Sequence, residues 1–116
     1  MYLQSLKLNN KTALVTGAGK GIGKACAIAL AEAGADLILV SRTQKDLSSV
    51  QKTIKKLKRQ CTSVICDVSD YDEVKRLFSQ IKKLDVLVNN AGTNIPENFA
   101  KIKKKDMDYV VDLNLK

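Results

Sequence analysis

The chain has 116 residues, 45% hydrophobic and 28% charged, which fits one domain with an ordinary buried core. Its formal net charge is +8, it has no histidine, and its three cysteines lack metal-ligand spacing, so we expect neither a metal site nor a histidine-based triad. The sequence contains no apolar run long enough to span a membrane, and its N-terminus does not resemble a signal peptide. We therefore expect a cytoplasmic protein with reduced thiols.

Apolar, strand-like segments alternate with helix-like segments along the whole chain. The expected strands are 12–16, 36–41, 62–68 and 85–90. The expected helices are 23–34, 43–58, 69–83 and the start of a fourth within 103–116. This alternation predicts βαβ units around a parallel sheet, and the continuous apolar strands fit burial on both faces.

Helical periodicity and capping residues support the expected helices. The second helix begins with Thr43 and Asp46 as its expected cap. The last expected helix has an apolar stripe at 107, 110 and 111, and Asn114 falls on the same stripe. A polar residue on a buried face usually has a local reason, although Asn114 could instead lie past the core and contact water.

The turn TGAGKGIG, from Thr16 to Gly23, joins the first strand to the first helix and holds four of the six glycines in the chain. Glycine allows backbone angles and a close approach that a Cβ forbids. The first turn of a helix also offers free N–H groups at the positive end of its dipole. The turn therefore predicts a pyrophosphate site, with tight strand–helix packing as the alternative.

The positive charge of the chain raises the question of a nucleic-acid partner. The lysines, however, gather in helical stretches, at 52–58, 82–83 and 101–105. No aromatic residue interleaves with the 52–59 stretch, as a base-stacking surface would require. We interpret these lysines as solvated helix faces and expect no nucleic-acid partner.

Four motifs together resemble those of the short-chain dehydrogenase/reductase family. They are Thr16-Gly17 with Gly21, Ile22 and Gly23; Asp67-Val68; Asn89-Asn90-Ala91-Gly92; and Asn114 in DLNLK. The resemblance covers the chain from about Lys7 to Lys116. It implies a Rossmann fold, which is a three-layer, doubly wound parallel sheet, with the strand order 3-2-1-4. Residues 1–116 are then expected to form one NAD(P)-binding domain that is truncated at its C-terminus.

The resemblance also implies roles for particular residues. The expected cofactor-binding residues are Thr16, Gly17, Gly19, Lys20, Gly21, Ile22, Gly23, Ser41, Arg42, Asp67, Val68, Asn89, Asn90, Ala91 and Gly92. By this resemblance Asp67 faces the adenine, although alone it could be an ordinary turn residue, and Asn90 and Gly92 face the nicotinamide. Asn114 is the expected catalytic residue, holding a water in a proton relay.

The second strand ends in DLILVSRT, which bears on the choice between NAD and NADP. An acid at this place accepts from the 2′-hydroxyl of NAD, whereas a basic residue accommodates the 2′-phosphate of NADP. Here Ser41 stands where the acid is expected and Arg42 follows it. Lys20, in the glycine turn, resembles a second basic position of NADP-preferring members. We therefore expect NADP(H), with exposed basic residues of no function as the alternative.

The family's serine and Tyr-x-x-x-Lys are not found in these 116 residues. Tyr71 and Lys75 have the spacing, but they lie on the third expected helix, where we interpret them as a surface pair. We therefore expect the cofactor-binding half of a carbonyl reductase, inactive alone, with 85–90 as an exposed strand edge. The complete form is expected to be a homo-oligomer that reduces a 3-oxoacyl thioester or a sugar or polyol ketone. The alternative is a non-catalytic dinucleotide-binding remnant or sensor.

Overall fold

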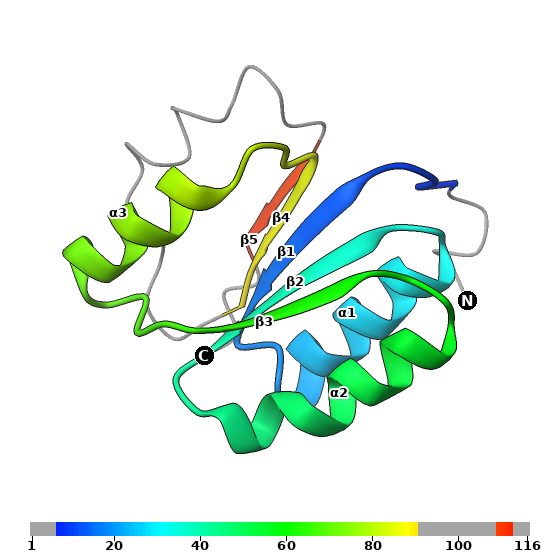
Figure 1. Cartoon of the computed structure of the whole chain (residues 1–116), viewed down its shortest axis with the longest axis horizontal. Coiled ribbons are helices and arrows are strands. Elements are labelled where there is room, and N and C mark those ends of the chain that lie inside the picture. The colour runs from blue at the N-terminus through cyan, green and yellow to red at the C-terminus, as the bar shows by residue number, and fades with distance from the viewer. Residues whose placement is uncertain (1–6, 91–108, 113–116) are drawn as a thin grey trace.

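The computed structural model describes residues 7–90 and 109–112 and shows alternating strands and helices (Figure 1). The elements are β1 (Thr12–Thr16), α1 (Gly21–Glu32), β2 (Asp36–Ser41), α2 (Gln44–Lys56), β3 (Cys61–Ile65), α3 (Tyr71–Gln80), β4 (Val86–Asn89) and β5 (Tyr109–Asp112). Over these residues the strands form one parallel sheet in the order β3-β2-β1-β4-β5. The predicted doubly wound sheet with the order 3-2-1-4 is confirmed.

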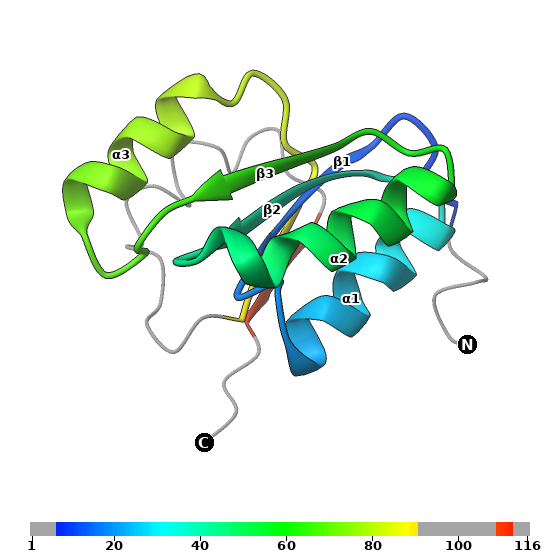
Figure 2. The same cartoon turned by 60° about the horizontal axis from the view of Figure 1, so that its bottom comes forward.

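Among the described residues, three helices cover the two faces of the sheet. Helices α1 and α2 lie side by side on one face, and α3 lies on the other (Figures 1 and 2). Side chains of β1 alternate between the two resulting cores: Ala13 and Val15 pack toward α1 and α2, while Leu14 packs with the buried residues of α3. All three are fully buried, as the continuous apolar strands predict.

The prediction of a helix within 103–116 is wrong for residues 109–112. These residues form β5, which pairs in parallel with β4 and aligns Val86 with Tyr109 and Val88 with Val111. Aromatic and β-branched residues favour strands, and the outer edge of β4 offers unpaired backbone groups to them. The expectation that β4 is an exposed edge is therefore also wrong.

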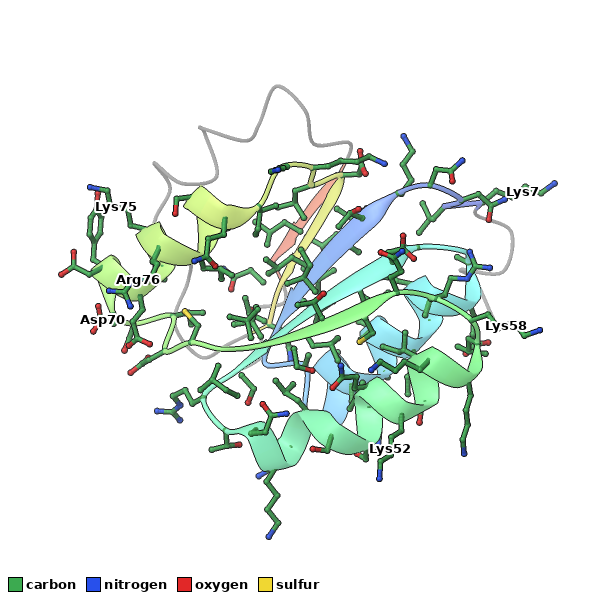
Figure 3. The ribbon with its side chains drawn as sticks, in the orientation of Figure 1. Lys7, Lys52, Lys58, Asp70, Lys75 and Arg76 are labelled. Carbon is green, nitrogen blue, oxygen red and sulfur yellow. The ribbon has the colours of Figure 1, made fainter. Side chains whose placement is uncertain are left out.

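Several exposed lysines lie on or beside the helices that cover the sheet. Lys52 and Lys58 are exposed and project outward from the α2 side, and Lys75 projects from α3 (Figure 3). Among the described residues, no helix is both long and apolar enough to cross a membrane.

Candidate functional site

A pocket of about 480 Å³ opens at the carboxyl ends of the central strands. Its walls come from the turn after β1, the segments after β2 and β3, and the residue after β4. They are Gly17, Gly19, Lys20, Val40, Ser41, Arg42, Thr43, Asp46, Cys66, Asp67, Val68, Ser69 and Asn90. Parallel strands place their carboxyl ends at one edge of a sheet, which brings these four distant segments together.

Thr16 ties the glycine turn to the end of β4. Its side chain is fully buried, and its hydroxyl accepts a hydrogen bond from the Asn90 backbone N–H at 2.9 Å. The same hydroxyl donates to Oδ1 of Asn89 at 3.2 Å. The Asn90 side-chain amide donates to the Gly17 carbonyl at 3.4 Å. These bonds fix the positions of the two motifs relative to each other.

Gly17 and Gly23 of the turn have little or no room for a side chain. Gly17 has a φ of +61°, and a Cβ there would lie 3.1 Å from the Asn90 carbonyl oxygen. A Cβ on Gly23 would overlap the Gly17 carbonyl oxygen and lie 2.5 Å from Nδ2 of Asn90. Gly21 has a φ of +55°, but a Cβ there would meet nothing within 4 Å. Gly21 is therefore favoured by its backbone angle, whereas Gly23 is required by close approach.

The N-terminus of α1 has neither a side-chain cap nor an acidic residue in its first turn. Its N-cap residue is Lys20, whose side chain makes no capping hydrogen bond. By contrast, α2 and α3 have acidic residues in their first turns, and Asp70 caps α3 by accepting from two backbone N–H groups. The free N–H groups and positive dipole end of α1 fit an anionic group such as a pyrophosphate.

Opposite charges are matched within the pocket. Lys20 Nζ lies 3.8 Å from Oδ2 of Asp46. Asp67 accepts from the Ser69 hydroxyl at 2.6 Å and from its backbone N–H at 3.0 Å. These hydrogen bonds, helped by the positive charge of Arg42, hold the pKa of the Asp67 carboxyl below its ordinary value. Asp67 is therefore ionised at neutral pH.

The structure brings together about half of the residues predicted for the site. Those in the pocket wall are Gly17, Gly19, Lys20, Ser41, Arg42, Asp67, Val68 and Asn90. Thr16 and Asn89 are buried beside the pocket instead of lining it. Gly21, Ile22 and Gly23 form the first residues of α1. Ala91, Gly92 and Asn114 lie outside the described residues.

Several lining residues were not predicted from the sequence, chiefly Thr43 and Asp46. Both were expected only as the cap of the second helix, but the Thr43 side chain makes no capping hydrogen bond with the backbone; its hydroxyl instead donates to Oδ2 of Asp46 at 2.7 Å. A Cβ on Gly19 would overlap the Cβ of Asp46. The missing side chain at Gly19 thus lets the first turn of α2 approach the glycine turn, and this was the only sequence signal available.

Comparison with known proteins identifies relatives over almost the whole chain. Residues 11–116 match the family described as short chain dehydrogenase. A 2-dehydro-3-deoxy-D-gluconate 5-dehydrogenase of Pseudoalteromonas atlantica is 42% identical over 118 residues, covering 97% of this chain and 46% of that protein. A 3-oxoacyl-acyl-carrier-protein reductase of Rickettsia conorii is 37% identical, and the alignment covers 96% of this chain and 45% of the reductase. The chain thus spans less than half the length of these relatives.

Solved structures show the same fold. A metagenomic short-chain oxidoreductase in complex with NADP superposes with a TM-score of 0.71 at 36% identity, covering 74% of this chain and 40% of that one. A carveol dehydrogenase of Mycobacterium avium in complex with NAD gives a TM-score of 0.66 at 28% identity, covering 78% of this chain and 38% of its own. Of these two solved structures with the same fold, one thus contains NADP and the other contains NAD.

Proposed function

This chain belongs to the short chain dehydrogenase family, and we propose that it forms the dinucleotide-binding half of an NADP(H)-dependent oxidoreductase. One observation carries the proposal: the glycine turn, Lys20, Arg42, Asp67 and Asn90 converge on one pocket at the carboxyl ends of parallel strands. Dinucleotides bind at this place in doubly wound folds.

The residues of the pocket fit the parts of the dinucleotide in order. The uncapped first turn of α1 would bind the pyrophosphate through its backbone N–H groups. Asp67 and Val68, after β3, would contact the adenine. Thr16 would not touch the cofactor, because it is fully buried, but would hold Asn90 and the glycine turn in place.

The 2′-phosphate is assigned to the segment after β2. Ser41 and Arg42 line the pocket there, and Lys20 lines it from the glycine turn. Arg42 is exposed and can present two N–H groups to phosphate oxygens, which a lysine cannot do in the same planar geometry. An acid that would accept from a 2′-hydroxyl is replaced by Ser41, which favours NADP(H) over NAD(H).

We further propose that the complete protein transfers a hydride between the nicotinamide and a carbonyl or alcohol. The nicotinamide supplies the hydride when it is bound. Asn90, after β4, would border the nicotinamide end of the site, with Ala91, Gly92 and Asn114 contributing beyond it. Relatives named for a keto sugar acid and for a 3-oxoacyl thioester support a carbonyl substrate of one of these kinds.

The choice of cofactor is tested by replacing Arg42 with alanine. A lost charged hydrogen bond costs about 1.5–3 kcal/mol, so Arg42→Ala should weaken NADPH binding about 10- to 150-fold. NADH has no 2′-phosphate, and its affinity should change little. Affinities for both cofactors would be measured by fluorescence titration of the purified protein.

Arg76→Ala is the matched control, because Arg76 is an exposed arginine on α3 that does not line this pocket. It should leave both affinities unchanged. Equal losses for NADPH and NADH in Arg42→Ala would contradict the assignment of the 2′-phosphate. If the unaltered protein bound neither cofactor, the proposal of a dinucleotide site would itself be wrong.

A further inference from the structure

Asp46 places a carboxylate in the wall of the proposed 2′-phosphate site. It belongs to the first turn of α2, and the absent side chain of Gly19 lets it lie against the glycine turn. Its side chain is 29% exposed, and Oδ2 accepts the Thr43 hydroxyl at 2.7 Å. The carboxylate is therefore held in a fixed position beside the pocket.

This carboxylate faces one of the two cations assigned to the phosphate. Lys20 Nζ lies 3.8 Å from Oδ2 of Asp46, and the Lys20 side chain is 80% exposed. The other cation, Arg42, lies close enough to Asp67 to favour the ionised form of that acid. The two cations thus share the pocket with two acids. A dianionic phosphate entering it meets a site with little net positive charge.

An exposed ion pair of this length gives little stability to the fold. The Asp46 carboxylate affects the binding of an anionic ligand more than it affects fold stability, because it both attracts Lys20 and repels the phosphate. The Thr43 hydrogen bond favours the orientation in which the Asp46 carboxylate faces Lys20. The phosphate must therefore compete with Asp46 for Lys20.

We propose that Asp46 is a specificity-determining residue that lowers the affinity of this site for a 2′-phosphate and so limits its preference for NADP(H) over NAD(H). The inference rests on the proposed function. It adds that the Lys20–Asp46 pair restrains the cofactor preference that Lys20 and Arg42 produce. Removing only the charge of Asp46 should strengthen binding of ligands that carry the phosphate.

The test compares two nucleotides that differ only in this group. Asp46→Asn removes the charge but keeps an acceptor for the Thr43 hydroxyl. Binding of 2′,5′-ADP and 5′-AMP to the purified protein would be measured by titration calorimetry. We expect Asp46→Asn to bind 2′,5′-ADP about three- to tenfold more tightly and 5′-AMP with unchanged affinity. The gain should shrink as salt rises from 50 to 500 mM, because Lys20 is exposed and its interactions are screened.

Glu32→Gln is the matched control, since Glu32 is an exposed acid at the far end of α1 that does not line the pocket. It removes the same charge and should change neither affinity, so a gain in both variants would overturn the inference in favour of a general charge effect. Unchanged or weaker binding of 2′,5′-ADP by Asp46→Asn would also overturn it, while leaving the proposed function in place. If the unaltered protein bound neither nucleotide, the proposed function would fail and this inference with it. Thermal unfolding of each variant verifies that it is folded.

Discussion

Thr16 offers a test of how the glycine turn is fixed to the end of β4. Its hydroxyl accepts a hydrogen bond from the Asn90 backbone N–H and donates one to the Asn89 side chain. Valine has nearly the same shape as threonine but can neither accept nor donate a hydrogen bond. Thr16→Val should therefore largely keep the packing of β1 and remove the hydrogen bond to the Asn90 backbone N–H, while the bond from the Asn90 side chain to the Gly17 carbonyl remains.

The size of the effect follows from burial. Thr16 is fully buried, Asn89 is 4% exposed and Asn90 is half-buried. A buried polar group that loses its partner costs about 1–3 kcal/mol. Water can reach Asn90 in part, so a total of about 1–3 kcal/mol is expected, which lowers the Tm of a domain of this size by roughly 5–20 °C.

Hydrogen exchange at the Asn90 amide is the sharpest assay, because it reports the bond itself. Exchange should be markedly faster in Thr16→Val than in the unaltered protein. Thr16→Ser is the matched control: it loses a buried methyl, at about 1 kcal/mol, but keeps the hydroxyl, so the Asn90 amide should stay protected. The affinity for NADPH should likewise be lower in Thr16→Val than in the unaltered protein and unchanged in Thr16→Ser.

Equal protection of the Asn90 amide in Thr16→Val and the unaltered protein would refute this reasoning. It would mean that the Thr16 hydroxyl does not hold the two motifs together. Loss of protection in both variants would place the effect in packing instead of hydrogen bonding.

Two further predictions concern the turn and the sheet. Gly23→Ala should destabilise the fold by about 1–3 kcal/mol, because its Cβ would overlap the Gly17 carbonyl oxygen. A denaturant midpoint for Gly23→Ala no lower than that of the unaltered protein would contradict this. Burial raises the pKa of the Cys61 thiol to about 11, against an ordinary value of 9.0. Above pH 9 the unfolded chain therefore loses this proton first, and stability should fall between pH 9 and 11. Guanidinium denaturation of Cys61→Ala should show a smaller fall over this range.

The sequence was sufficient to predict the sheet because its strands are short apolar segments separated by helices of clear periodicity. The order of the first four strands follows from right-handed crossovers and the reversal of winding after β3, and the structure confirms it. The glycine turn was located for the same reason, since its neighbours on both sides are unambiguous. Bounds differ by a few residues: the third strand ends at Ile65, where the pairing with Ser41 at the end of β2 stops.

The segment around Tyr109 shows where pattern alone was insufficient. Apolar residues at 107, 110 and 111 satisfy a helical stripe, but Tyr109, Val110 and Val111 are also a short apolar run that a buried strand can use. Periodicity cannot separate these two cases over so few residues. The decision depends on the free edge of β4, which is a tertiary feature that local sequence does not contain.

The charge of the pocket is a second feature that the sequence alone could not predict. The chain has a net charge of +8, and both Lys20 and Arg42 line the pocket, so the sequence suggests a strongly positive site. In the fold, Asp46 lies beside Lys20 although the two are 26 positions apart along the chain, and the absence of a side chain on Gly19 makes room for this approach. Exposed lysines such as Lys52 and Lys75 lie on helices away from the pocket, and their charges are screened by solvent over about 8–10 Å. The affinity of the site for a phosphate therefore depends on the few charges that share the pocket, and not on the net charge of the chain.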